Sequence, residues 1–255
     1  MNVTIALLAA VTGYLSGSIS SARIVTQIAA PEADLSRTEF PSSDTDDKIV
    51  GDFVSATTVS VHLGTRLGFA TVVLDMLKIV IPTLVFKRLW PDSPYFLIVA
   101  TTAMIGHIWP LYHGFKGGRG LSAVYGGMFA IDWIGVFATS LAGMIFGLVV
   151  LRDVLVAYMA GLWFVIPWLW FRTYDPYHVV YGLAVNIIFM LGIIPEMRQY
   201  LAFKREGKGG DVSEAMQQTG MGRGIYKMGR RLGLLDDAVT DNGANEGGDG
   251  CASDG

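Results

Sequence analysis

Residues 133–151 read WIGVFATSLAGMIFGLVVL, a run of nineteen residues without one charged side chain. A helix needs about 20 residues to cross roughly 30 Å of hydrocarbon, so this run is long enough to span a bilayer. Backbone polar groups in lipid must be satisfied within the segment, and each span is therefore expected to be helical. Together with this run, the candidate spans are 3–29, 67–89, 94–113, 120–132, 133–151, 153–171 and 177–196.

The number of such runs decides the fold class. A soluble chain of 255 residues can bury one or two apolar helices, but not six or seven. Hydrophobic residues make up 52% of the chain and charged residues 16%, against about 25% charged in a soluble domain. The sequence predicts an all-α, polytopic helical membrane protein with about seven transmembrane helices. The segment 120–132 is short and is open to interpretation as a re-entrant helix.

Charges near the span ends predict the topology and the domain division. With the N-terminus outside, the inner loops carry more Lys and Arg than the outer loops, as the positive-inside rule requires. Residues 1–196 are then the transmembrane domain, and residues 197–255 are a cytoplasmic tail. Beyond about residue 236 the tail is Gly-rich and acidic, so disorder is expected there. The inner-loop cations are Arg37, Lys48, Lys116, Arg119 and Arg152, and the outer ones are Lys87, Arg88 and Arg172.

The single cysteine, Cys251, excludes a disulfide framework and a cysteine-rich metal site. The four histidines have no metal-ligand spacing. We therefore expect no metal and no cofactor. No nucleic-acid partner is expected either.

The most informative stretch is Gly106-His107-Ile108-Trp109-Pro110, followed by Phe115-Lys116-Gly117-Gly118-Arg119-Gly120. Glycines let backbone amides turn toward a ligand, and a helix that starts directly afterwards favours an anion at its N-terminus. Lys116 and Arg119 add full positive charge. This pattern indicates a phosphate cradle, although a tight inner turn with positive-inside anchors would look the same.

Further polar residues lie in the first two spans and in the loop between them. Asp75 and Lys78 are three residues apart, so they share a helix face and are able to pair. Ionisable residues within a span are costly and usually functional, but a structural ion pair is the alternative. The run Ser55-Ala56-Thr57-Thr58 fits a headgroup site or an ordinary helix cap. In the first span, the small residues around Ser18 fit close helix packing.

At these residues the chain resembles the acyl-phosphate:glycerol-3-phosphate acyltransferases of bacterial membranes. The family motifs read approximately GSIPFG, GSGNxGATNxxR, DxxKG and GHxFPxxxxFKGGKG. The resemblance implies seven spans, an active site on the cytoplasmic side and a prokaryotic plasma membrane. Arg119 stands where the family has a lysine. In the family's order, the corresponding stretches here are 17–22, 51–61, 75–79 and 106–120.

Several positions depart from the family pattern. Phe53 replaces an asparagine and Val61 replaces an arginine, for which Arg66 is a candidate substitute. Ile79 stands in place of the glycine after the lysine, and a final HRxNIxRL motif is not recognisable around 193–198. These departures leave open a divergent relative with a different acceptor, or a non-catalytic lipid-phosphate binder. A membrane transporter is a lesser alternative, because repeated halves with paired broken helices are not seen.

The resemblance implies transfer of an acyl chain from acyl phosphate to the sn-1 hydroxyl of glycerol 3-phosphate, giving lysophosphatidic acid for phospholipid biosynthesis. No protein nucleophile or cofactor is needed, and the acyl tail would lie between helices among the membrane lipids. The residues expected to be catalytic are Lys116, Arg119, His107 and Ser55. Those expected to bind substrate are Gly117, Gly118, Gly120, Thr57, Thr58, Arg66, Lys78 and Ser18.

Overall fold

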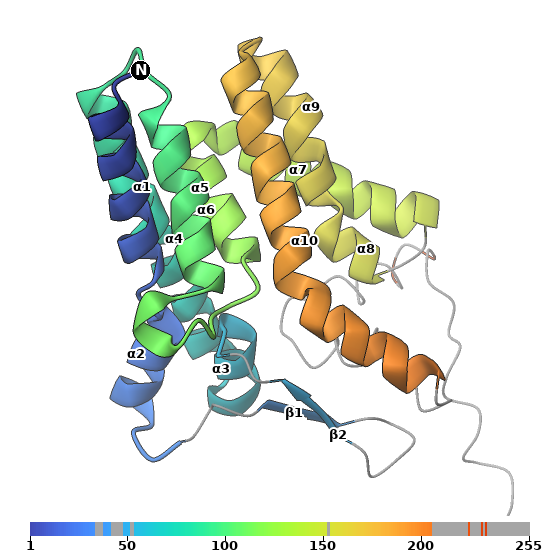
Figure 1. The fold of residues 1–255 in the computed structure, drawn as a ribbon. Helices are drawn as coiled ribbons and strands as arrows, with labels where there is room; N and C mark the ends of the chain where they lie inside the picture. Colours follow the sequence, from blue (N-terminus) through green and yellow to red (C-terminus); the bar gives the residue numbers. More distant parts are fainter. Residues whose placement is uncertain are drawn as a thin grey trace, which may run out of the picture.

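A computed structural model describes residues 1–33, 38–41, 48–51, 54–151 and 154–205, together with the isolated positions 224, 231 and 233. Helices dominate these residues (Figure 1). The helices are α1 (Val3–Gly17), α2 (Ser21–Ala29), α3 (Ala56–Leu63), α4 (Thr65–Leu89), α5 (Tyr95–Ile108), α6 (Leu121–Ile131), α7 (Trp133–Ile145), α8 (Val154–Met159), α9 (Gly161–Thr173) and α10 (Pro176–Arg205). A 3₁₀ turn (Leu111–His113) follows α5, and a π-helical segment (Phe146–Leu151) follows α7.

The described residues include five helical segments that are long and apolar enough to cross a membrane. The predicted span 120–132 corresponds to the shorter apolar helix α6, and the predicted span 153–171 is divided between α8 and α9. The multi-pass helical fold is thus confirmed, whereas the count of seven stays a prediction. The five segments are Val3–Ala29, Thr65–Leu89, Tyr95–His113, Trp133–Leu151 and Pro176–Ile194.

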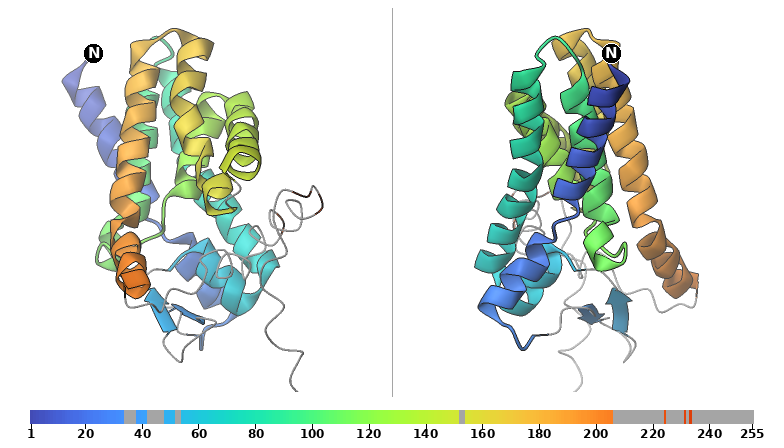
Figure 2. Two further views of the ribbon diagram at one scale, coloured as in Figure 1. Left: turned by 90° about the vertical axis from the view of Figure 1, so that its right-hand side faces the viewer. Right: turned by 60° about the vertical axis from the view of Figure 1, so that its left-hand side comes forward.

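The two ends of the helix bundle differ. One end, which we call the outer end, holds the N-terminus, the α4–α5 turn and the α9–α10 turn (Figure 1). The opposite end, which we call the inner end, holds α2, α3 and the connection between α5 and α6 (Figure 2). Helix α3, from the expected loop 30–66, and the α5–α6 connection, from the expected loop 114–119, therefore lie at the same end. Which side of the membrane this end faces stays a prediction.

Helices α1 and α5 pack closely because glycines remove side chains from their contact. A Cβ at Gly17 would lie 2.8 Å from Cα of Ala103, and a Cβ at Gly106 would lie 2.9 Å from the backbone nitrogen of Ser18. Small residues permit such an approach between membrane helices. The hydroxyl of Tyr14 also donates to the carbonyl of Trp109, at 3.0 Å. The first span is thus fixed against the end of α5, where the glycine-rich connection begins.

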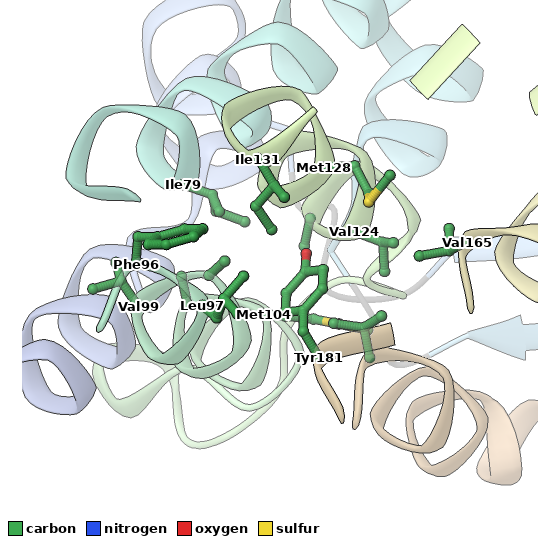
Figure 3. Packing of buried hydrophobic residues seen from close by; sticks show 14 of the residues in the cluster. Ile79, Phe96, Leu97, Val99, Met104, Val124, Met128, Ile131, Val165 and Tyr181 are labelled. Carbon is green, nitrogen blue, oxygen red and sulfur yellow. The ribbon is translucent and has the colours of Figure 1, made fainter. Parts of the chain in front are cut away.

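The main hydrophobic core joins α4, α5, α6, α9 and α10 (Figure 3). Ile79, Val99, Val124 and Val165 come from four of these helices and are fully buried. Large apolar side chains on the opposite helix faces are exposed, as expected of surfaces that meet lipid. Examples are Leu7, Val11, Phe69, Ile81, Leu141, Val180 and Ile187.

The first inner loop contains a feature that the sequence analysis did not anticipate. Strands β1 (Thr38–Pro41) and β2 (Lys48–Gly51) pair in antiparallel register, with Thr38 opposite Gly51. Each strand has only four residues and no clear alternation, so no strand signal was visible in the sequence. At the other end of the chain, α10 continues to Arg205. The expected disorder beyond residue 236 lies outside the described residues.

Candidate functional site

A narrow polar pocket opens at the inner end, where α1, α2, α4 and α5 meet the α5–α6 connection. The four helices converge there in two of the views (Figures 1 and 2). Ionisable side chains and glycines face the same small space, an arrangement suited to an anion held by both charges and amides. The residues that line the pocket are Gly17, Ile19, Ser20, Ala22, Val54, Asp75, Lys78, His107, Pro110, Gly117 and Gly118.

Asp75 is the centre of the charged cluster in this pocket. Its Oδ1 lies 2.9 Å from Nζ of Lys78 and 3.6 Å from Nδ1 of His107, and all three side chains are less than a tenth exposed. Nζ of Lys78 also donates to the carbonyl of Ile19, at 2.6 Å. Burying an ion pair is favourable only when further hydrogen bonds compensate for lost hydration. Lys78 therefore links α4 to the break between α1 and α2, and its ammonium faces the pocket.

His107 holds the glycine-rich connection against α5. Its main-chain carbonyl accepts a hydrogen bond of 3.0 Å from the amide of Gly118. The imidazole packs on the same glycine, because a Cβ at Gly118 would lie 2.9 Å from Cε1 of the ring. The Nδ1 atom of His107 is buried without a hydrogen-bond partner, since 3.6 Å to Asp75 is too long for one. The histidine thus orients the loop through its carbonyl and its ring face.

The connection from Pro110 to Gly120 has the backbone geometry of an anion loop. Phe115 and Gly120 adopt positive φ values, of 61° and 90°, and α6 begins directly after Gly120. The amides of Gly117 and Gly120 have no hydrogen-bond partner within the described part of the chain, whereas the amide of Gly118 is bonded to His107. Two of the three glycine amides expected at a phosphate are therefore available. The third one serves the loop itself.

The two cations of this loop differ in their exposure. Lys116 is exposed, and Arg119 is half-buried just before α6. Neither lines the narrow pocket, but both lie within two residues of Gly117 or Gly118, which do. The two cations are therefore next to the pocket in the chain but are not part of its wall.

The hydroxyl run after the hairpin caps helix α3. Oγ of Ser55 accepts from the amide of Thr58 at 3.4 Å and lies 3.5 Å from the Thr58 hydroxyl, and both side chains are buried. Thr57 is half-buried on the same turn. Val54, the residue before the cap, lines the pocket. The structure thus brings this run to the edge of the site, with its first role as a helix cap.

Two other expected residues have positions that the sequence did not reveal. Ser18 is fully buried, and its hydroxyl donates to Tyr14 (2.8 Å) and accepts from the amide of Leu111 (3.2 Å), so it fastens the loop to α1. Arg66 is exposed in the first turn of α4 and is not among the residues that line the pocket. The charge that Arg66 was expected to supply is therefore absent from the pocket wall.

The contact between Asp75 and His107 was not predicted from the sequence. The residues are far apart in the chain, and only the packing of α4 against α5 brings them together. Each residue alone was recognisable as a candidate, because it is an ionisable residue within an apolar span. Among the described residues, no three His, Cys, Asp or Glu side chains gather as a metal site would require.

The chain is similar to proteins of one known family. The model of the family described as glycerol-3-phosphate acyltransferase matches residues 44–202, more than half of the chain. The chain belongs to the glycerol-3-phosphate acyltransferase family. The matched region contains α3, α4, α5 and the glycine-rich connection, and therefore most of the pocket.

Curated relatives carry the same description. The chain is 34% identical over 127 residues to a glycerol-3-phosphate acyltransferase of Pelagibacter ubique, covering 49% of this chain and 59% of the relative. It is 29% identical over 182 residues to one of Francisella tularensis subsp. novicida, covering 71% of each chain. The chain thus spans between about three fifths and seven tenths of the length of these relatives.

Solved structures share the fold. A crystal structure of PlsY (YgiH), an integral membrane glycerol 3-phosphate acyltransferase in its lysophosphatidic acid form, superposes with a TM-score of 0.62 and 22% identity, covering 77% of this chain and 92% of that one. A structure of its glycerol 3-phosphate form gives the same TM-score at 21% identity. That match covers 80% of this chain and 94% of the other one. The helical membrane architecture is therefore common to both proteins.

Proposed function

We propose that the protein transfers a fatty acyl chain from acyl phosphate to the sn-1 hydroxyl of glycerol 3-phosphate, giving lysophosphatidic acid. The hydroxyl oxygen forms a bond to the acyl carbonyl carbon, and the bond from that carbon to the phosphate oxygen breaks. The hydroxyl proton ends on the released phosphate. Because acyl phosphate is a mixed anhydride with a good leaving group, the protein need not supply a nucleophile.

One observation carries the proposal: the pocket joins a buried lysine to a glycine-rich turn in a chain of this family. The reaction has to bring two anionic phosphates together, and proximity of this kind lowers the barrier. Lys78 and Gly117 both line the pocket, and the loop cations Lys116 and Arg119 are chain neighbours of Gly117 and Gly118 outside that lining. Positive charge and amides in and beside the pocket suit two phosphates and also stabilise negative charge that develops during transfer.

The residues then divide into three roles. Lys116, Arg119 and the amides of Gly117 and Gly120 hold the acyl phosphate. Lys78 and the hydroxyl run of Ser55, Thr57 and Thr58 are on the glycerol 3-phosphate side. His107 and Gly118 fix the loop by their mutual hydrogen bond and packing. The phosphate of the acyl phosphate serves as the base and leaves with the hydroxyl proton. No side chain therefore needs to take that proton.

The proposal includes an orientation of the protein in the membrane. The inner end would face the cytoplasm, where water-soluble glycerol 3-phosphate is available, and the N-terminus would be outside in a prokaryotic plasma membrane. The acyl chain would remain between helices in the bilayer. In a Cys251→Ser background, the Lys116→Cys variant should then react with a membrane-impermeant maleimide only after the cytoplasmic face is exposed.

The decisive experiment is an acyl-transfer assay on purified protein in lipid. Palmitoyl phosphate and labelled glycerol 3-phosphate are supplied, and lysophosphatidic acid is measured. The test variant is the Lys116→Ala, Arg119→Ala double mutant. The matched control is Arg88→Ala, which removes an exposed cation at the outer end.

We expect product from the wild type and from the control, and a loss of at least about a hundredfold in the double mutant, since two charged phosphate contacts are removed. If folded wild-type protein forms no product, these substrates are wrong. A different acceptor, or a protein that binds lipid phosphate without catalysis, would then replace the proposal.

A further inference from the structure

Arg23 lies in the first turn of α2, next in the chain to residues that line the pocket. Ser20 and Ala22, which precede it, line the pocket, and the hydroxyl of Ser20 accepts from the amide of Arg23 at 3.5 Å. Ser20 is the N-cap of α2, and its hydroxyl thus holds Arg23 close to the break between α1 and α2, where the Ile19 carbonyl lies. That carbonyl accepts the hydrogen bond from Lys78. The arginine and the pocket lysine therefore approach the same corner from two helices.

The side chain of Arg23 is not satisfied within the described protein. It is half-buried, and its Nε atom is buried without a hydrogen-bond partner. A guanidinium donor that lacks both water and a partner is costly, and such groups call for a specific explanation. Arg66, the cation expected to reinforce the site, is exposed and does not line the pocket.

The surroundings of Arg23 are positively charged. His113, in the turn after α5, experiences the charges of both Arg23 and Lys78. The one carboxylate that lines the pocket, Asp75, is already paired with Lys78. Cations gathered in this way, with a donor left over, match a doubly charged anion better than a neutral ligand. The planar fork of arginine fits two oxygens of one phosphate group.

We propose that Arg23 is a further substrate-binding residue, which together with Lys78 binds the phosphate group of glycerol 3-phosphate. The inference rests on the proposed function for the identity of the substrate. It divides the site into two phosphate positions. The loop cations Lys116 and Arg119 take the donor phosphate, and Arg23 with Lys78 takes the acceptor phosphate on the α2 side. It also explains how the chain tolerates Val61 in α3 and an exposed Arg66 in α4.

The first test separates the two substrates by steady-state kinetics. Arg23→Gln should raise the KM for glycerol 3-phosphate about tenfold or more, because a bidentate charged contact is lost. The KM for palmitoyl phosphate should stay within about twofold. Arg23→Lys keeps the charge but not the planar fork, so its KM for glycerol 3-phosphate should lie between those of the wild type and Arg23→Gln. Arg88→Gln, at the outer end, is the control and should behave as the wild type.

Two kinetic outcomes overturn the inference. The first is a KM for glycerol 3-phosphate in Arg23→Gln equal to that of Arg88→Gln. The second is a rise confined to the KM for palmitoyl phosphate, which contradicts the assignment to the acceptor.

The second test uses the wild type and needs neither a variant nor acyl transfer. Phenylglyoxal, which condenses with guanidinium groups, is applied to the protein in lipid, and modified peptides are measured by mass spectrometry. Glycerol 3-phosphate should protect Arg23 at least about fivefold but leave Arg88 unprotected. Glycerol should protect neither.

Inorganic phosphate should protect Arg23 in part, because it carries the recognised group. Equal modification of Arg23 with and without glycerol 3-phosphate overturns the inference. So does an Arg23 that the reagent cannot reach, since a phosphate could not reach it either. Protection without any acyl transfer would support the binding site while refuting the proposed reaction, so the two failures are distinguishable.

Discussion

Helix α4 carries two lysines, Lys78 and Lys87, whose roles differ. They are nine residues apart, which is roughly 14 Å along the helix. Nζ of Lys87 donates to the carbonyls of Ala130 (3.0 Å) and Ile131 (2.8 Å), where α6 ends. Nζ of Lys78 pairs with the buried carboxylate of Asp75. Lys87 thus caps the end of α6, whereas Lys78 lines a polar pocket.

The charged residue near Lys87 is also fully used by the fold. At the outer end, Asp132 begins α7 by accepting from the amide of Ile134 (3.2 Å), and it also accepts from Nε1 of Trp168 (3.0 Å) and Nε of Arg172 (3.2 Å). Its two carboxylate oxygens thus accept three hydrogen bonds that hold α7 and α9 together. Charge that is fully satisfied by the fold indicates a structural role.

The inner end contains polar groups that the described fold does not pair. Nδ1 of His107 and Nε of Arg23 are buried without hydrogen-bond partners. The amides of Gly117 and Gly120 also have none within the described residues. Unsatisfied donors around a pocket are what an anionic ligand would complete. The comparison teaches that, in this fold, buried charge alone does not mark the site, whereas buried charge with unused donors does.

The largest effect is expected from Gly118→Ala. The added Cβ would collide with the His107 ring, at 2.9 Å from Cε1, and would push the loop away from α5. We expect the rate of acyl transfer to fall more than about a hundredfold, because misplacement by 1 Å is enough for such a loss. Initial rates are compared at equal amounts of folded protein. The control is Gly224→Ala, which has open space around it; an active Gly118→Ala would contradict the loop geometry.

Next in size is Lys78→Met. The change removes a cation from the pocket and leaves the carboxylate of Asp75 buried without its partner. We expect kcat/KM for glycerol 3-phosphate to fall about thirtyfold or more, and unfolding to become easier by about 3 kcal/mol. Steady-state kinetics and thermal unfolding measure the two quantities. Loss of stability with unchanged kcat/KM would assign Lys78 a purely structural role.

Lys87→Met is the matched substitution at the other end of α4. It removes two hydrogen bonds to the last carbonyls of α6 and a contact 5.6 Å from the centre of the Phe96 ring. We expect the free energy of unfolding to fall by about 1–3 kcal/mol. The kcat/KM of the folded fraction should remain within about twofold of the wild type. A large kinetic defect here would erase the difference between the two ends.

The smallest effect is expected from Tyr14→Phe. Only the hydrogen bond from the Tyr14 hydroxyl to the Trp109 carbonyl is lost, while the glycine contacts between α1 and α5 remain. A single hydrogen bond of this kind is worth about 1 kcal/mol. Thermal unfolding should detect this loss, and activity should fall less than about threefold. A complete loss of activity would mean that the hydroxyl belongs to the site.

The sequence predicted the parts of this molecule that depend on local pattern. Long apolar runs are sufficient to indicate membrane helices, because length and polarity alone decide whether a segment can cross lipid. The three-residue spacing of Asp75 and Lys78 likewise predicted their pairing, which the structure contains. The glycine-rich connection was visible for the same reason, since its glycines and cations are neighbours in the chain.

What the sequence could not predict depends on contacts between distant segments. The approach of Asp75 to His107 requires α4 to pack on α5 in one register. The use of the Gly118 amide by the loop itself, and the exposure of Arg66, are also decided by packing. The β1–β2 hairpin falls in this class, because strands of four residues carry too little pattern to be recognised. The count of membrane crossings rests on short helices such as α6, which length alone does not decide.

The most direct test of the account is the thermal stabilisation by glycerol 3-phosphate of three proteins: the wild type, Lys87→Met and Lys78→Met. A ligand that binds only the folded state raises Tm by an amount that grows with the logarithm of the ligand concentration divided by its Kd. At a ligand concentration about tenfold above the wild-type Kd, the wild type and Lys87→Met should gain the same few degrees, whereas Lys78→Met should gain almost nothing. Equal stabilisation of both variants, or a loss confined to Lys87→Met, would contradict the claim that the pocket at the inner end is the phosphate site.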